Sequence, residues 1–185
     1  GSEMCIRDRA FHPRLLLVGR DEWYDPKAVP AAIVMLCLYF SYGCLLTIVP
    51  DLGDHLGVPN RGLFFTLFTL GSISTRLFAG RMSDRLGRVP VIRVSVWLIA
   101  GAMALFACAQ TIWGLYTASL VFGLGFGVFA PAITAWTVDL GDPARKGRAL
   151  ATLYIALELA IGGGAALSGW WYANNIDNVP AIFWS

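Results

Sequence analysis

The sequence predicts an all-α membrane protein with five transmembrane helices and the start of a sixth. Hydrophobic residues make up 57% of its 185 residues and charged residues only 14%, whereas an average soluble domain carries about 25% charged residues. The apolar residues gather in runs of roughly 20, the length at which a helix crosses about 30 Å of hydrocarbon. Basic residues cluster in alternate connections between these runs, as is typical of a multi-pass membrane protein.

The first apolar run has Pro30 near its start and Pro50 at its end. We predict helices over residues 29–49, 62–80, 89–109, 112–138 and 149–173, with a truncated sixth beginning at 179–185. Residues 1–9 (GSEMCIRDR) are polar and resemble a non-native, adapter-derived scar, so they are excluded from the fold. Residues 10–28 are expected to form a cytoplasmic linker, and residues 29–185 the membrane bundle.

The lysines and arginines predict the orientation of the chain. If the helices alternate in direction, all fourteen of these residues except Arg61 fall on one side of the membrane. Cytoplasmic loops of membrane proteins are enriched in Lys and Arg. We therefore expect the N-terminal end of the chain to be cytoplasmic.

The composition argues against several other functions. The formal charge of +2 is too small to indicate a nucleic-acid partner. The four cysteines lack the spacing of a metal site and three lie in apolar runs, so we predict neither a metal nor another cofactor. The sequence contains no nucleophile elbow, HExxH motif or P-loop, and we do not expect an enzyme.

A charged stretch, GRMSDRLGR, separates the second and third predicted helices. If it keeps a helical turn, Asp84 can pair with Arg81 at i, i+3 and with Arg88 at i, i+4. Charge alone favours an ordinary positive loop whose arginines meet anionic lipid. The order of the residues favours a second interpretation, and the residues that carry it are Gly80, Arg81, Asp84, Arg85, Gly87 and Arg88.

This order resembles the G-x-x-x-D-R-x-G-R loop signature of the major facilitator superfamily, a large class of secondary transporters. The resemblance runs from about residue 22 onward, and the connection DLGDPARKGRALAT is similar to the loop between the tenth and eleventh helices of bacterial exporters. It implies the C-terminal half of such a transporter in the bacterial inner membrane. The N-terminal six-helix half would then be missing from the chain.

The resemblance also implies a mechanism, in which two six-helix bundles rock about a central site and give alternating access. Proton-coupled export of a small solute is expected. In this scheme residues 80–88 form a cytoplasmic latch that holds one conformation through contacts between the halves. The implied partners are the lipid bilayer, a small-molecule substrate, protons and the missing half.

Glu158 lies near the middle of the fifth predicted helix. Ionisable residues inside a membrane are candidate functional residues, so Glu158 is interpreted as a proton-coupling or substrate-contacting carboxyl. The alternative is a protonated or hydrogen-bonded structural glutamate that packs against a neighbouring helix.

Four other polar residues are candidates to line the cavity: Tyr39, Tyr42, Thr47 and Arg76. The two tyrosines are i, i+3 neighbours and offer hydroxyls and ring faces, although such groups also bond simply across helices. Arg76 lies one turn before Gly80, where snorkelling to the interface is the competing explanation.

Small residues in the fourth and fifth helices predict close helix packing. They are Gly123, Gly127, Gly162, Gly163 and Gly164.

A competing class of function is a membrane scaffold or subunit that transports nothing, whose helices serve association alone. A multi-pass membrane enzyme ranks third, because the sequence lacks a polar catalytic cluster.

Overall fold

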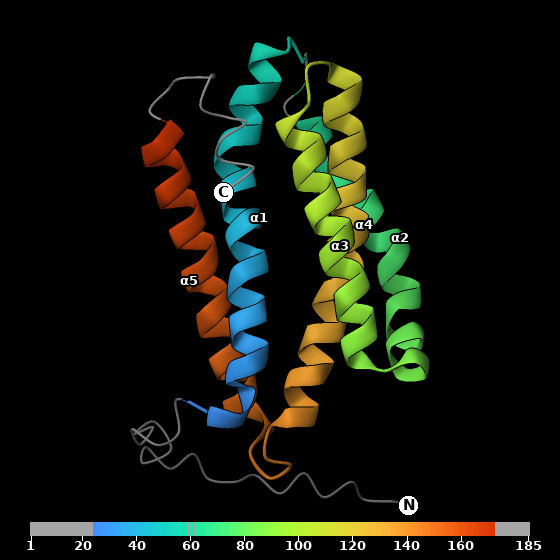
Figure 1. Ribbon diagram of the computed structural model, residues 1–185, viewed down its shortest axis with the longest axis vertical. Coiled ribbons are helices and arrows are strands. Elements are labelled where there is room, and N and C mark those ends of the chain that lie inside the picture. Colours follow the sequence, from blue (N-terminus) through green and yellow to red (C-terminus); the bar gives the residue numbers. More distant parts are fainter. Residues whose placement is uncertain (1–23, 59, 61, 173–185) are drawn as a thin grey trace, which may run out of the picture.

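The computed structural model describes residues 24–58, 60 and 62–172. This part of the chain contains a short 3-10 helix and five long α-helices, with no strand (Figure 1). They are η3 (Pro26–Ala28), α1 (Val29–His55), α2 (Gly62–Leu86), α3 (Arg88–Ala107), α4 (Ile112–Leu140) and α5 (Lys146–Tyr172). All five α-helices are long and apolar enough to cross a membrane, which confirms the predicted fold class. The scar at 1–9, linker residues 10–23 and the sixth-helix start at 179–185 lie outside the described residues.

The helices pack in two groups (Figure 1). Helix α1 packs along α5, and we call these two the α1–α5 pair. Helices α2 and α3 both pack along α4, and we call these three the α2–α3–α4 group. Contacts between the two groups are sparse and come mainly from α4. Helix α4 is also the most buried of the five, so it forms the centre of the bundle.

One end of the bundle carries both the α2–α3 turn at Gly87 and the α4–α5 turn at residues 141–145. We call it the basic end, because the arginines of both turns lie there. Helix α4 finishes at this end, and α5 starts there (Figure 1). The ends of α2 and α4 are therefore close in space although far apart in sequence.

Two predicted helix ends are wrong. Helix α1 does not stop at Pro50 but continues to His55, because a proline removes only one backbone donor, and membrane helices tolerate that loss. Helix α2 does not stop at Gly80 but continues to Leu86. A glycine inside a helix costs only about 1 kcal/mol, and residues 81–86 contain no helix breaker. The real stop is Gly87, whose φ of 90° suits only glycine.

The outer surface of the bundle is apolar. Trp97, Trp113 and Trp170 are each more than 70% exposed, and many exposed leucines and isoleucines accompany them. A soluble protein rarely exposes so many large apolar side chains. The surface therefore suits contact with a lipid bilayer.

Candidate functional site

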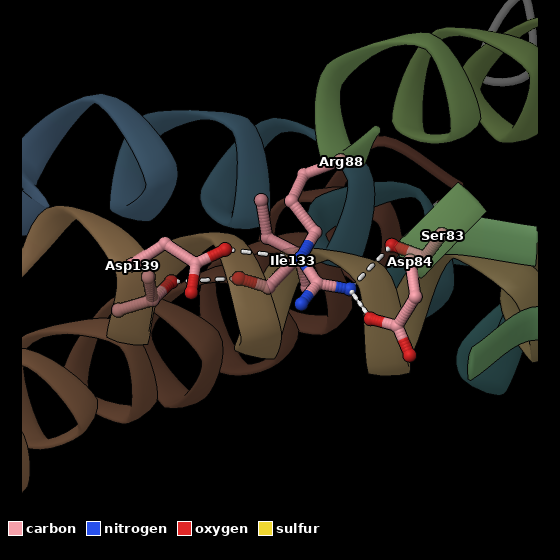
Figure 2. Close-up of polar contacts among 6 residues, drawn as sticks. Ser83, Asp84, Arg88, Ile133 and Asp139 are labelled. Atoms are coloured by element: carbon pink, nitrogen blue, oxygen red, sulfur yellow. Dashed lines mark hydrogen bonds and ion pairs between the residues drawn. The ribbon is translucent and has the colours of Figure 1, made fainter. Parts of the chain in front are cut away.

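Arg88 links the end of α2 to the end of α4 at the basic end (Figure 2). Its Nη1 lies 2.5 Å from Oδ1 of Asp84 and donates to Oγ of Ser83 at 3.1 Å. Its Nε donates to Oδ2 of Asp139 at 3.0 Å. A planar guanidinium presents several N–H groups in a fixed fork, so it can hold partners on two sides at once. We call these four residues the Arg88 clasp.

The local fold explains how Arg88 reaches both acids. Gly87 breaks the backbone between α2 and α3, so Arg88 becomes the first residue of α3. From there its side chain turns back toward the last turns of α2 and across to α4 (Figure 2). The clasp therefore fixes the α2–α3 hairpin against the end of α4.

The other residues of the loop signature are not members of the Arg88 clasp. The predicted i, i+4 pair of Asp84 and Arg88 is present, but the predicted i, i+3 pair of Arg81 and Asp84 does not form. Arg81 and Arg85 are exposed, and neither makes an ion pair within the described residues. Gly80 is a plain helical residue with open space around it.

Sequence reasoning missed Asp139 and Ser83. Asp139 lies 51 positions from Arg88, so no helical spacing connects the two. A signal was nevertheless present, because Asp139 is an acid at the same predicted membrane side as the arginine cluster. Ser83 is 2% exposed and looks like an ordinary packing residue in the sequence.

A cavity of about 700 Å³ lies beside the clasp, between the α1–α5 pair and the α2–α3–α4 group. All five helices contribute to its lining, and Arg88 and Asp139 of the clasp belong to it. Along α4 the lining runs from Ala130 to Asp139, which is about 14 Å at a rise of 1.5 Å per residue. Pockets for small molecules have volumes of about 300–1,000 Å³, so this cavity is large enough for a solute.

Two of the four predicted cavity residues, Tyr39 and Arg76, line this cavity. Tyr154 of α5 joins them as a lining residue that sequence reasoning missed. Arg76 and Tyr154 are both near enough to Tyr39 to interact with it electrostatically. Near Tyr39, the cavity therefore brings together the guanidinium of Arg76 and the phenol of Tyr154, so that three helices contribute polar groups to one place.

Tyr42 and Thr47 are not among the lining residues of this cavity. The Tyr42 ring is parallel to the Phe122 ring, with centroids 6.4 Å apart, and it also contacts Phe68 and Phe126. Thr47 Oγ1 donates to the carbonyl oxygens of Gly43 and, on α5, Ala165 at 3.5 Å. Both residues therefore connect helices.

The rings of Tyr39, Tyr42, Phe68, Phe122, Phe126 and Phe129 form an aromatic cluster. Tyr39 meets Phe126 edge to face, with centroids 5.1 Å apart. Edge-to-face and offset contacts of this kind contribute about 0.5–1.5 kcal/mol per pair beyond burial. Because the two tyrosines belong to α1 and the phenylalanines to α2 and α4, the cluster joins the two helix groups.

Glu158 lies in the middle of α5 and its side chain is exposed. It is not a lining residue of the cavity, and it makes no hydrogen bond or ion pair within the described residues. Both interpretations of Glu158, as a coupling or substrate-contacting carboxyl and as a protonated or hydrogen-bonded structural glutamate, stay predictions.

The predicted packing glycines fall into two sets. A Cβ at Gly123 or Gly127 would collide with the backbone of α2, and one at Gly164 with the backbone of α1. These three glycines therefore permit the close approach of helices. Around Gly162 and Gly163 a Cβ would meet no atom of the described residues within 4 Å, so these two do not pack against a described helix.

Among the described residues, no three His, Cys, Asp or Glu side chains gather as they would around a metal ion. The chemistry that the site offers is thus ionic and aromatic. Arg88 holds two carboxylates at once, and Arg76 and the two tyrosines offer hydrogen-bond donors to the cavity.

Five helices that are each long and apolar enough to cross a membrane define a multi-pass membrane protein, and a cavity of about 700 Å³ lies between its two helix groups. The sequence model of the Major Facilitator Superfamily matches residues 31–185. The chain belongs to this superfamily.

Two curated relatives indicate how far the similarity reaches. The uncharacterized MFS-type transporter YhhS of Salmonella enteritidis is 26% identical over 129 residues, which are 70% of this chain and 32% of that protein. The multidrug resistance protein MdtH of Yersinia enterocolitica is 31% identical over 109 residues, which are 59% of this chain and 27% of that protein. The chain thus matches about a third or less of the length of these relatives.

Proposed function

We propose that this chain is the C-terminal helical half of a secondary transporter that moves a small solute across the bacterial inner membrane. The superfamily match and the names of the relatives support this proposal. The observation that carries it is the position of the Arg88 clasp, since two of its members, Arg88 and Asp139, also line the cavity. Any movement that opens the clasp therefore also changes the cavity.

In this proposal residues 80–88 form a conformational latch through contacts with an N-terminal six-helix half of the same protein, which rocks against this one. The Arg88 clasp lies within this half and holds the latch residues in position, so that the latch stabilises one of the two states. A bias of a few kcal/mol is enough to make the other state minor. Breaking a single exposed ion pair costs about 0.2–1 kcal/mol, so the latch stays reversible.

We further propose that transport is export coupled to protons, with the basic end in the cytoplasm. The excess of Lys and Arg at that end supports the orientation, and the relation to MdtH supports export. Glu158 is the candidate coupling carboxyl, because it is an acid in the middle of a membrane-spanning helix.

The test uses the complete gene product, expressed in bacteria that lack their main exporters. Cells are exposed to a panel of anionic, neutral and cationic compounds, and the accumulation of each compound is measured. We expect lower accumulation of at least one compound. Asp84→Asn should reduce its transport severalfold while membrane abundance stays near wild type. Equal losses of transport and abundance would show that Asp84 has a purely structural role.

Proton coupling has its own test. Vesicles that contain the complete gene product are given a pH gradient, and solute movement is followed with and without Glu158→Gln. We expect this variant to lose pH-driven transport and to keep exchange of solute without a gradient. Unchanged pH-driven transport in the variant would rule out Glu158 as the coupling residue.

The competing function, a membrane scaffold that transports nothing, makes a different prediction about the gene. A transporter gene should encode about six further helices before this chain, with a second copy of the G-x-x-x-D-R-x-G-R signature. A scaffold has no need of that second copy. The cavity favours the transporter, because helices that serve association alone need no solute-sized space between them.

A further inference from the structure

We propose that the cavity between the two helix groups binds an organic anion, and that the guanidinium of Arg76 recognises its charge. The inference rests on the proposed function, since it takes this cavity to be the solute site. It goes further by naming the chemical class of the solute and the residue that selects it.

The first argument is the pairing of the charged lining residues, which are Arg76, Arg88 and Asp139. Arg88 and Asp139 pair with each other, and Arg88 pairs with Asp84 as well. Arg76 makes no hydrogen bond or ion pair with any described residue, and Glu158 is not part of the lining. Among the described residues, the guanidinium of Arg76 is therefore the charged group of the lining that has no direct partner.

The second argument is the surroundings of Arg76. It lies on α2 before the charged residues 81–86, and the next two residues, Leu77 and Phe78, are apolar side chains that are 72% and 67% exposed. The outer surface here therefore suits lipid, in which a charged side chain without a partner is costly. An anionic ligand in the cavity would offset this cost.

The third argument is the rest of the lining. The hydroxyls of Tyr39 and Tyr154 make no hydrogen bond to any described residue, so they are free to donate to an anion. The Tyr39 ring continues into the aromatic cluster through Phe126 and Phe129, and Leu157 and Met35 add apolar surface. The site therefore fits an anion with an aromatic or otherwise apolar body, such as an aromatic carboxylate.

An anionic lipid headgroup offers the same charge as a solute. The two sources differ in how they respond to the composition of the membrane. A lipid site competes with added anionic lipid, whereas a solute site binds the same solute in neutral and in anionic bilayers. We favour a solute, because Arg76 lines a cavity to which all five helices contribute.

The experiment measures binding to the purified complete gene product by equilibrium dialysis. Three probes share one ring system and differ in charge: naphthoate, naphthamide and naphthylmethylammonium. Binding is measured in discs of phosphatidylcholine and again in discs with equal parts of phosphatidylglycerol. The variants are Arg76→Gln, Arg76→Lys and, as a matched control, Arg93→Gln. Arg93 is an exposed arginine on α3 that does not line the cavity.

We expect naphthoate to bind at least about tenfold more tightly than the other two probes, because a hydrogen bond to a charged group is a strong one. Arg76→Gln should abolish this preference, Arg76→Lys should keep part of it, and Arg93→Gln should leave it intact. The inference is overturned if naphthoate does not bind, if the cation or the amide binds as tightly, or if the preference survives Arg76→Gln. Loss of naphthoate binding in phosphatidylglycerol discs would assign Arg76 to lipid and also overturn it.

These outcomes separate the inference from the proposed function. A protein that exports only cations in the cell assay would still be a transporter, but its cavity would not select anions. A protein that binds naphthoate through Arg76 but moves no compound in cells would keep the anion site and lose the transporter function.

Discussion

Nε of Arg88 lies 3.0 Å from Oδ2 of Asp139, although the two residues are 51 positions apart in the chain. This contact joins the start of α3 to the end of α4. The same guanidinium holds Asp84 at the end of α2. One side chain thus connects three helices at one end of the bundle.

Asp139→Asn should shift the balance between the two transport states. The half-exposed pair contributes about 0.5–1 kcal/mol, so we expect the state that the clasp stabilises to lose roughly two- to fivefold in population. Spin labels on α3 and α5 of the complete gene product, read by pulsed electron resonance, measure that ratio. Asp142→Asn is the control. Asp142 lies at the same end, and among the described residues its side chain accepts a hydrogen bond only from the backbone N–H of Ala144, a bond that the carbonyl oxygen of an asparagine side chain can also accept.

Arg88 variants should show a graded effect on transport. Arg88→Lys keeps the charge but loses the fork that holds Asp84 and Asp139 at once, so we expect an intermediate transport rate. Arg88→Gln should give a rate close to that of the Asp84→Asn, Asp139→Asn double variant. A lysine variant with the full wild-type rate would show that charge alone, without the shared geometry, is sufficient.

Gly123→Leu should destabilise the protein, because its side chain would collide with the Phe68 carbonyl on α2. Overpacking of this kind costs about 1–3 kcal/mol, and here the obstacle is backbone. Thermal unfolding in detergent and membrane abundance should both fall. Gly101→Leu is the matched control, since Gly101 is exposed on α3 with open space around it. Equal stability of the two variants would refute the close packing of α2 and α4.

Tyr42 should act through its ring and not through its hydroxyl. Its ring stacks on Phe122 and contacts Phe68 and Phe126, and its hydroxyl bonds to no described residue. Tyr42→Phe should therefore unfold at nearly the wild-type temperature. Tyr42→Ala should lose on the order of 3 kcal/mol. A phenylalanine variant that transports poorly while folding normally would instead assign the hydroxyl to the solute.

The fold could be predicted well because bilayer thickness restricts it so strongly. Apolar runs of about the membrane-crossing length leave almost no alternative to a helix, and all five predicted helices are present. The helix ends were harder, as Pro50 and Gly80 show. Membrane helices tolerate proline and glycine in their interior, whereas Gly87 stops α2 through its positive φ.

Only the part of the clasp that joins residues close in sequence could be predicted. The Asp84–Arg88 pair follows from a spacing of four residues. Asp139 joins through tertiary packing of α2 and α3 on α4, which no local pattern encodes. The same holds for the cavity lining. Tyr39 and Arg76 could be predicted because they are polar residues in apolar helices. The place of Tyr154 in the lining could not, because it depends on which face α5 turns toward α4.

The aromatic cluster has a mechanical consequence for the bundle. Inside each helix group, backbones meet at glycines such as Gly123 and Gly164, where even a small displacement produces a collision or a gap. Between the groups, the rings of Tyr39 and Tyr42 on α1 meet phenylalanine rings of α2 and α4, and such contacts change gradually as rings slide or tilt. The bundle should therefore be stiff within each group and compliant along the boundary between them, the same boundary at which the cavity lies.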